Sequence, residues 1–207
     1  MFKGKKVLIG VTASIAAYKS AELVRLFKKA GAYVQVLQTK SSLQFIPTLT
    51  LSTLSKNPVL TDMVDPESGD WNNHVDLGLW ADFMVIAPLT ANTMSKMING
   101  ECDNLLLATY LSAKCPVYFA PAMDLDMYKH PSTSNNIKKL QSFGNTLIPS
   151  GFGELASGLV GEGRMSEPKE IVEQILLDLS SGLPLSNKEV LITAGPTYEM
   201  IDPVRFI

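Results

Sequence analysis

Short apolar segments, each about the length of one strand, alternate along this chain with longer segments of helical pattern. The clearest covers residues 83–87, which are apolar throughout, as in strands that are buried on both faces of a parallel sheet. Residues 7–10, 33–38, 116–120 and 146–150 are predicted to be strands as well. Strands alternating with helices at this spacing predict an α/β fold, a doubly wound parallel sheet in a flavodoxin-like or Rossmann-like three-layer sandwich.

Capping residues and prolines set the boundaries of the other predicted elements. Thr12 or Ser14 can cap a helix over residues 15–30, which Gly31 ends. Pro88 is expected to stop the strand that it follows, because proline has no N–H for the sheet. Further helices are predicted over residues 43–54, 93–98, 103–113, 131–143 and 167–179, and loops over residues 62–73 and 151–163.

The composition narrows the classes of function. A chain of 207 residues with 46% hydrophobic content can bury one full core. The formal net charge is −2 and the 18 basic residues are scattered, so the sequence shows no basic patch that would bind nucleic acid or an anionic membrane. The apolar segments are too short to cross a bilayer. Cys102 and Cys115 lack metal-ligand spacing, and Met1 is not followed by a signal-peptide pattern. We therefore expect reduced thiols, no metal site and a cytoplasmic protein.

The chain changes character near residue 180. Residues 180–187 have the composition of a linker, and residues 189–193 are predicted to start a fresh strand. The residues that remain are too few to form a core of their own. The expected organisation is one domain over residues 1–180, a linker over residues 181–188, and a second domain over residues 189–207 that is cut short.

Polar side chains follow two of the predicted strands at the point where each strand ends. Thr90, Asn92 and Thr93 come after the third strand, and a second such segment, residues 121–127, comes after the fourth. Small polar side chains and free backbone N–H groups at the carboxyl end of a parallel strand form a ledge that binds ligands. His74 lies shortly before the first ledge. Two ledges with a histidine nearby predict a ligand site at this edge of the sheet.

The first strand-to-helix turn favours a mononucleotide over a dinucleotide. A dinucleotide site needs several glycines in this turn, but only Gly10 is present. Thr12 and Ser14 instead offer hydroxyl groups at a helix N-terminus, and Thr39 adds another at the end of the second strand. This arrangement suits one phosphate better than two, which favours FMN over NAD, although ordinary helix capping explains Thr12 and Ser14 equally well.

Three segments of the chain form specific motifs: His74-Val75-Asp76-Leu77, Ala87-Pro88-Leu89-Thr90-Ala91-Asn92-Thr93 and Pro121-Ala122-Met123-Asp124-Leu125-Asp126-Met127. They resemble the signatures of the homo-oligomeric flavin-containing cysteine decarboxylases, and most closely those of the phosphopantothenoylcysteine decarboxylases. The resemblance covers about residues 1–180. Residues 192–197 and 201–207 resemble the opening of the phosphopantothenate–cysteine ligase domain, which many bacteria fuse behind the decarboxylase. The two resemblances together imply a bifunctional protein of coenzyme A biosynthesis, cut soon after its second domain begins.

The resemblance implies an activity, a cofactor and a set of site residues. The activity is FMN-dependent decarboxylation of 4′-phosphopantothenoyl-cysteine to 4′-phosphopantetheine, with a preceding CTP-dependent ligase step in the full-length protein. Family members form trimers, or dodecamers built from trimers, with FMN between subunits. His74 would handle the proton, and Met123 and Asp124 would lie over the substrate carboxylate. The flavin would be held by Pro88, Thr90, Asn92, Thr93 and Ala122, beside the candidate phosphate ligands Thr12, Ser14 and Thr39.

Two residues depart from the family pattern. Asp124 stands where the family usually has asparagine, and an ionised carboxylate there would repel the substrate carboxylate unless Asp124 is protonated or paired with a cation such as Arg164. Ser157 lies in a loop over residues 153–165 that resembles the family's substrate clamp, and Arg164 of this loop would bind substrate. Ser157 stands where several members carry a cysteine implicated in the reductive half of the cycle, so Ser157 and His74 are the candidate catalytic residues. These departures leave two alternatives open. One is a relative that acts on another cysteine or a prenyl substrate, and the other is a flavin-binding regulatory homologue that has lost turnover.

Overall fold

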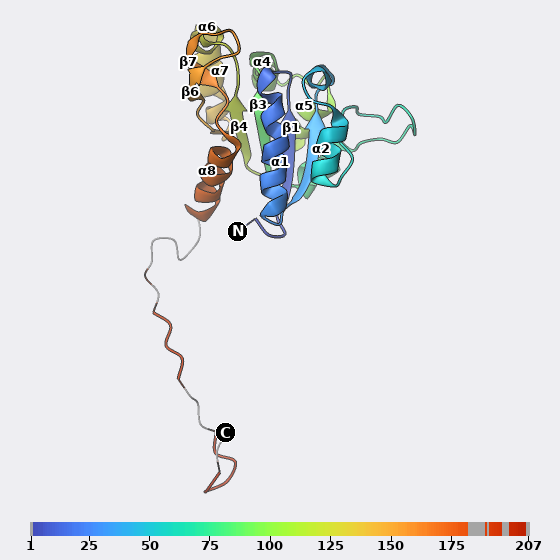
Figure 1. Ribbon diagram of the computed structural model, residues 1–207. Coiled ribbons are helices and arrows are strands. Elements are labelled where there is room, and N and C mark those ends of the chain that lie inside the picture. Colours follow the sequence, from blue (N-terminus) through green and yellow to red (C-terminus); the bar gives the residue numbers. More distant parts are fainter. Residues whose placement is uncertain (1, 182–188, 190, 196–198, 206–207) are drawn as a thin grey trace. The chain divides into compact units, whose positions relative to one another are not determined.

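A five-stranded parallel sheet forms the centre of the computed structural model, with strand order β2-β1-β3-β4-β5 (Figure 1). The structure describes residues 2–181, 189, 191–195 and 199–205. This strand order is the flavodoxin-like one, so the predicted α/β fold is confirmed. The strands are β1 (Lys6–Val11), β2 (Tyr33–Gln38), β3 (Phe83–Leu89), β4 (Val117–Pro121) and β5 (Thr146–Leu147).

Helices connect the strands and cover both faces of the sheet. The turns and helices of the first half are η1 (Ile15–Tyr18), α1 (Lys19–Lys29), η2 (Lys40–Gln44), α2 (Thr48–Ser55) and α3 (His74–Trp80). Those of the second half are α4 (Ala91–Asn99), α5 (Leu105–Ser112), α6 (Leu125–Lys129), α7 (Pro131–Ser142) and α8 (Pro168–Ser181). Among the described residues, none of these helices combines the length and the apolarity needed to cross a lipid bilayer.

The core lies on both sides of the sheet because successive strand side chains point to opposite faces. On one face, Met84 and Phe119 belong to a buried cluster with side chains of α4, α5 and α7. On the other face, the ring of Phe27 from α1 lies 5.7 Å from the ring of Phe83, which lies 6.0 Å from that of Tyr118. Each fully buried side chain of this size contributes about 1.5–3 kcal/mol.

At Pro47 and Pro88 the observed elements differ from the predicted ones. The predicted helix over residues 43–54 is divided at Pro47 into η2 and α2, because proline favours the first turn of a helix over its interior. The expectation that Pro88 stops the third strand is wrong. β3 continues to Leu89 through a cis Ala87–Pro88 bond, and its pairing with β4 shifts register between Ile86 and Leu89. At this irregularity the ladder does not require the N–H that proline lacks.

The glycine-rich segment over residues 151–163 is a hairpin and not the loop that we predicted. It contains β6 (Gly151–Glu154) and β7 (Val160–Arg164), which pair antiparallel. The turn between them includes Gly158 at φ +84°, a conformation that favours glycine. The fifth strand is also shorter than predicted, since β5 ends at Leu147.

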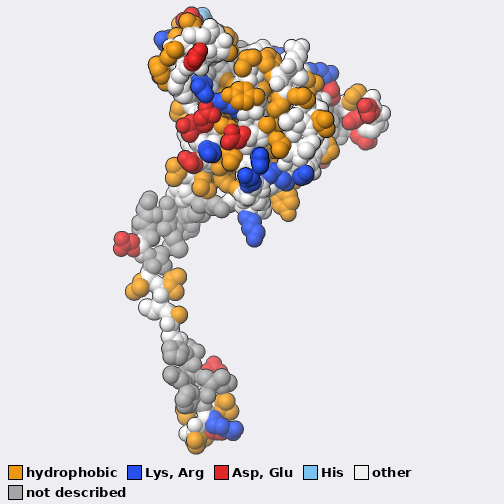
Figure 2. Space-filling model, viewed as in Figure 1, with side chains coloured by type: hydrophobic (Ala, Val, Ile, Leu, Met, Phe, Trp, Pro, Cys, Tyr) orange, Lys and Arg blue, Asp and Glu red, His pale blue; other side chains and the backbone are white. Residues whose placement is uncertain are grey.

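The segment between α2 and α3 projects from the body of the protein and carries acidic side chains (Figures 1 and 2). Val64 and Trp71 form an isolated antiparallel bridge within this segment. Glu67 and Asp70, which lie between them in the sequence, are exposed acidic residues. The predicted loop over residues 62–73 corresponds to this projection.

The chain divides into a compact unit up to Leu176 and a short unit over Leu177–Ile207. Glu189 and the described residues 191–193 carry no strand assignment, so the strand predicted over residues 189–193 is absent from this part of the structure. A strand needs a neighbour to pair with its backbone groups. Most of the predicted linker over residues 181–188 lies outside the described residues, as do Pro196 and Thr197.

Candidate active site

The predicted ledge after β3 is present and is organised by helix capping. Thr90 is the N-cap of α4, and its Oγ1 accepts a long hydrogen bond of 3.5 Å from the backbone N–H of Thr93. Asn92 and Thr93 occupy the first turn of α4, so their side chains lie at the carboxyl edge of the sheet. A capped first turn leaves backbone N–H groups available for an acceptor, and the helix dipole favours one that is negatively charged.

The first turn divides its two hydroxyl groups between different roles. Ser14 caps η1, because its Oγ accepts a hydrogen bond of 3.2 Å from Ala16 N–H. Thr12 is fully buried, and its Oγ1 donates to the Pro88 carbonyl oxygen and accepts from Thr90 N–H. The Thr12 hydroxyl group is therefore already committed inside the protein, where the sequence predicted a contact with a phosphate.

The end of β2 supplies a third group of polar side chains. Thr39 is the N-cap of η2, and its Oγ1 is buried without a hydrogen-bond partner among the described residues. Lys40 follows directly, and its Nζ lies 2.6 Å from a carboxylate oxygen of Asp62. A buried hydroxyl group with no partner costs about 1–3 kcal/mol, so this position favours a ligand that can bond to it.

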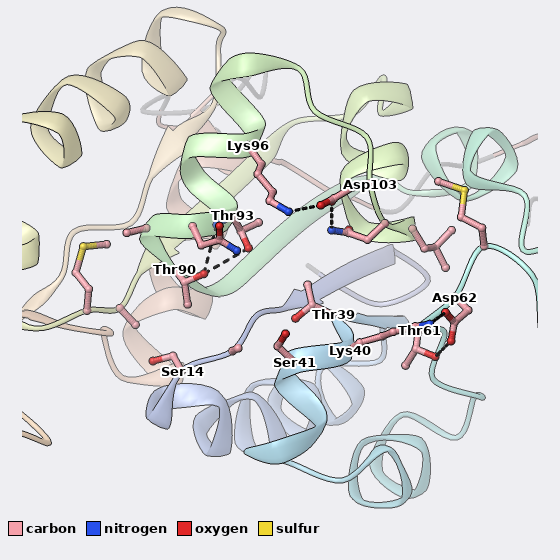
Figure 3. Close-up of a pocket in the computed structure, with 18 of the residues that line it drawn as sticks. Ser14, Thr39, Lys40, Ser41, Thr61, Asp62, Thr90, Thr93, Lys96 and Asp103 are labelled. Atoms are coloured by element: carbon pink, nitrogen blue, oxygen red, sulfur yellow. Dashed lines mark hydrogen bonds and ion pairs between the residues drawn. The ribbon is translucent and has the colours of Figure 1, made fainter.

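These three strand ends surround one cavity of about 900 Å³, which we call the strand-end cavity (Figure 3). Of the predicted site residues, it brings together Ser14, Thr39, Thr90, Asn92, Thr93, Ala122 and Met123. Pro88 and Thr12 do not line it. Sequence reasoning missed Lys40, Ser41, Thr61, Asp62, Lys96, Asp103 and Asn104, which line it as well. Lys40 and Ser41 could have been found from the signal that identified Thr39, since they directly follow it.

An ion pair lies in the wall of the strand-end cavity. Lys96 of α4 and Asp103 form it, and Figure 3 shows the two side chains pointing toward each other. The hydrogen bond from Lys96 holds the pKa of Asp103 below its usual value, and the same bond raises the pKa of Lys96. The pair therefore stays charged near neutral pH. Because the two charges are opposite and adjacent, they add little net charge to the wall.

A second cavity of about 440 Å³ lies between the first turn and the hairpin, and we call it the hairpin cavity. It shares Ser14, Ala122 and Met123 with the strand-end cavity. Its other lining residues include Asp124 and Arg164, which the sequence predicted to bind substrate. Met123 therefore lines two adjoining spaces. Both carry charged side chains, and the strand-end cavity is the richer of the two in hydroxyl groups.

The charged groups of the hairpin cavity pair in an unexpected way. Arg164 forms its ion pair with Glu167, at 3.1 Å, and not with Asp124. The buried Lys19 also bonds Glu167, at 2.9 Å, and donates to the Met165 carbonyl oxygen. The bond from Lys19 lowers the pKa of Glu167. Asp124 caps α6 by accepting from Leu125 N–H at 2.7 Å, and it forms no ion pair within the described residues. The suggested pairing of Asp124 with Arg164 is therefore wrong.

The two predicted catalytic residues line neither cavity of their own chain. Ser157 is exposed in the hairpin turn, where its Oγ accepts from Leu159 N–H at 3.4 Å. His74 is the first residue of α3, with its ring 6.0 Å from that of Trp71 and its Nδ1 buried without a described partner. The structure therefore brings together most of the predicted cofactor and substrate residues but leaves His74 and Ser157 apart from them.

The cysteines do not compensate for the serine at position 157. Cys102 is exposed and Cys115 is half-buried, and neither lines the strand-end or the hairpin cavity. Burial raises the pKa of the Cys115 thiol, which makes it a poorer nucleophile. Within the described residues, no group of three or more histidine, cysteine, aspartate or glutamate side chains is placed to hold a metal ion.

Two protein-family models match this chain, one over its larger N-terminal part and one over its C-terminal end. Residues 1–180 match the family model described as Flavoprotein, and residues 185–207 match that of the DNA/pantothenate metabolism flavoprotein C-terminal domain. The chain is 59% identical over 166 residues to a cysteine/cysteine sulfinic acid decarboxylase of an unknown prokaryotic organism, covering 78% of this chain and 46% of that protein. It is 42% identical over 209 residues to the coenzyme A biosynthesis bifunctional protein CoaBC of Bacillus subtilis, covering 100% of this chain and 51% of that protein. The chain thus spans about half the length of these relatives.

Solved structures of similar fold include decarboxylases and flavin-binding proteins. A PPC decarboxylase mutant complexed with pantothenoylaminoethenethiol matches with a TM-score of 0.76 and 36% identity, over 86% of this chain and 99% of the other. The FMN-binding protein AtHal3 matches with a TM-score of 0.75 and 35% identity, over 87% of this chain and 100% of the other.

Proposed function

The chain belongs to the flavoprotein family, and from that premise we propose that it binds FMN and decarboxylates 4′-phosphopantothenoyl-cysteine to 4′-phosphopantetheine. The observation that carries this proposal is the arrangement around Met123. This residue lines both the strand-end cavity, which is rich in hydroxyl groups, and the hairpin cavity, so a cofactor and a substrate can lie against each other there. The identities to a CoaBC protein and to a PPC decarboxylase structure support the choice of substrate.

The strand-end cavity fits a flavin mononucleotide. Ser14, Thr39 and Ser41 offer hydroxyl groups, and Lys40 offers a positive charge, which suit a phosphate and a polyol chain. The partnerless Thr39 hydroxyl group is the clearest sign that a ligand completes this wall. Thr90, Asn92 and Thr93 offer short polar groups for the ring system. Bound FMN would supply reversible electron transfer, so that the cysteine moiety is oxidised and reduced again within one turnover.

The protein's part in the reaction is to orient the substrate and to move a proton. Loss of the carboxyl group as CO₂ leaves a carbon that must gain a proton, so the reaction consumes one proton and needs no net oxidant. Met123 and the hairpin would hold the cysteine moiety and exclude water. His74 would handle the proton, because imidazole is the side chain that exchanges protons most readily near neutral pH. We place this chemistry in the cytoplasm, where thiols stay reduced.

An assembly of several copies would bring His74 to the site. His74 lines neither cavity of its own chain, while Val75 and Leu79 on the same helix are 42% and 62% exposed. Exposed apolar side chains that cluster on one element are typical of an interface. These observations support the trimer, or the dodecamer of trimers, with FMN and the active site between subunits. We also propose a decarboxylase domain over residues 1–180, a linker over 181–188 and the start of a CTP-dependent phosphopantothenate–cysteine ligase domain over 189–207.

The direct test of the proposed function measures CO₂ release and 4′-phosphopantetheine formation by the 207-residue chain supplied with FMN and 4′-phosphopantothenoyl-cysteine. The purified protein should absorb near ~450 nm, as bound flavin does. A protein that cannot be loaded with FMN would overturn the proposal. A loaded protein that releases no CO₂ from any cysteine substrate would instead support a flavin-binding regulatory homologue.

Substitution of Asn92 by leucine tests the cofactor site. The leucine side chain is close in size but removes the amide, so FMN affinity should fall by about tenfold or more, the equivalent of one or two lost hydrogen bonds. Fluorescence titration of the apoprotein with FMN measures this change. Asn99→Leu is a matched control, since Asn99 lies at the other end of α4 and outside the strand-end cavity. An Asn92→Leu protein that stays fully loaded at low FMN would remove Asn92 from the cofactor site.

A second candidate function is decarboxylation of free cysteine or a related small amino acid. The 59% identity to a cysteine/cysteine sulfinic acid decarboxylase supports it, and so does Asp124. A carboxylate in the hairpin cavity without an ion pair suits the free ammonium group of cysteine, which an acylated cysteine lacks.

Substitution of Asp124 by asparagine distinguishes these two functions. If the substrate is phosphopantothenoyl-cysteine, removing a negative charge beside its carboxylate should raise kcat/KM by roughly fivefold, the equivalent of about 1 kcal/mol at water-like screening. If the substrate is free cysteine, the same change should lower kcat/KM by a similar factor. Steady-state kinetics with both substrates, for wild type and variant, decide between the two outcomes. Unchanged kinetics with both would show that Asp124 contacts neither substrate.

A further inference from the structure

The backbone between Ala87 and Thr90 cannot be satisfied by the sheet alone. The pairing of β1 with β3 ends at Gly10 and Ile86, and the pairing of β3 with β4 shifts register between Ile86 and Leu89. This stretch is nevertheless buried, since Ala87 and Leu89 have no exposed surface. Buried backbone groups without partners are costly, so this segment needs hydrogen bonds from side chains.

Thr12 supplies two of these hydrogen bonds through one hydroxyl group. Its Oγ1 donates to the Pro88 carbonyl oxygen at 2.8 Å and accepts from the Thr90 N–H at 3.0 Å. The Thr12 side chain has no exposed surface, and its bond to Pro88 is buried while its bond to Thr90 is partly buried. One hydroxyl group therefore fixes the positions of the Pro88 carbonyl group and the Thr90 N–H group relative to each other.

We infer that Thr12 is a positioning residue that sets the width of the strand-end cavity. Thr12 directly precedes Ala13 and Ser14, which line one wall of this cavity, and it bonds Thr90, which begins the opposite wall of Thr90, Asn92 and Thr93. The Thr12 hydroxyl group thus joins two walls that are 78 residues apart in sequence. The inference rests on the proposed function, because it takes FMN as the occupant of the cavity.

A second hydroxyl group gives a natural comparison. Ser20 of α1 is also fully buried, and its Oγ donates to the Ala87 carbonyl oxygen at 2.9 Å. It holds the same stretch of β3 one residue earlier, but it bonds neither Pro88 nor Thr90 and lines neither cavity. Loss of the Ser20 hydroxyl group therefore reports the effect on stability alone.

The experiment compares three variants of the full 207-residue chain: Thr12→Val, Thr12→Ser and Ser20→Ala. Valine keeps the shape of threonine but removes the hydroxyl group, which leaves the buried Pro88 carbonyl group and the partly buried Thr90 N–H group unpaired. FMN affinity, measured by fluorescence titration of the apoproteins, should fall by about 10- to 100-fold in Thr12→Val. Thr12→Ser keeps the hydroxyl group and should stay within about threefold of wild type. Ser20→Ala should lower the melting temperature of the apoprotein while its FMN affinity also stays within about threefold.

The outcomes separate this inference from the proposed function. Wild-type protein that binds no FMN would overturn the proposed function, whatever Thr12 does. Wild-type protein that binds FMN, with Thr12→Val binding it equally well, would overturn the inference alone. Equal losses of FMN affinity in Thr12→Val and Ser20→Ala would also overturn it, because the effect would then be general. If Thr12→Val does not fold, hydrogen exchange of the wild-type apoprotein decides, since the Thr90 amide must be among the protected ones and exchange at the rate of a loop would contradict the inference.

Discussion

Replacing His74 by asparagine should leave FMN bound while turnover falls by roughly 10²- to 10⁴-fold, the usual share of general acid–base catalysis. FMN should stay bound because His74 lines neither the strand-end nor the hairpin cavity of its own chain. Turnover should fall because asparagine cannot gain or release a proton near neutral pH, while its amide still fits the half-buried position at the start of α3. Visible absorbance measures the bound flavin, and CO₂ release measures turnover.

The other histidine provides the matched control. His130 caps α7, with its Nδ1 accepting from the Ser132 N–H, and it lines neither cavity. His130→Asn should therefore turn over at the wild-type rate. Near-wild-type turnover in His74→Asn would remove His74 from the mechanism.

A mixing experiment asks whether His74 acts on a neighbouring copy. Mixed assemblies of His74→Asn and Asn92→Leu chains contain some sites with both residues intact if the active site lies between subunits. Co-expression of the two variants, assayed at an FMN concentration that leaves the Asn92→Leu protein mostly without flavin, should then restore part of the activity. No recovery, in assemblies shown to contain both chains, would place His74 in the site of its own chain.

The fold was predictable because its determinants are local. The apolar run at residues 83–87 and the neighbouring segments each identify a strand without reference to the rest of the chain, and the helices between them force the strands to be parallel. The ledge after β3 was predictable for the same reason, since Thr90, Asn92 and Thr93 follow the strand directly. Their placement around one cavity follows from the parallel sheet, which collects its carboxyl ends at one edge.

The features that sequence reasoning missed depend on distant contacts. The partners of the Thr12 hydroxyl group are the backbone groups of Pro88 and Thr90, and nothing near Thr12 in the sequence indicates them. Lys96 and Asp103 line the cavity and form an ion pair there, and the periodicity of the helix that carries Lys96 does not indicate this pairing. The hairpin was missed because its strands are rich in glycine, which has a low strand propensity. Its strand β7 contacts α6, and the sequence does not indicate this packing.

Substitution of Gly163 by alanine should separate substrate handling from cofactor binding. Gly163 lies in β7 at φ +127°, and its carbonyl oxygen accepts from Met123 N–H at 3.0 Å. A Cβ atom at this position would lie far inside contact distance of the Met123 carbonyl oxygen. Backbone cannot yield as a flexible side chain can, so the hairpin must move away from the segment that carries Met123 and Asp124. A displacement of about 1 Å at a site that orients a substrate can cost roughly 10²-fold in rate, and we expect that loss in kcat/KM.

Gly158→Ala distinguishes this close approach from backbone strain. Gly158 also has a positive φ, +84°, but a Cβ atom there meets no atom within 4 Å. Both substitutions therefore place a side chain at a backbone conformation that L residues rarely adopt, at a cost of about 1–3 kcal/mol, and only Gly163→Ala pushes the hairpin away from Met123. FMN affinity should change by less than about tenfold in both variants, because Thr39, Thr90 and Asn92 remain in place. Equal kcat/KM in the two variants would show that strain alone limits the hairpin. A lower value in Gly163→Ala means that the contact between β7 and Met123 holds the substrate side of the site in its active geometry.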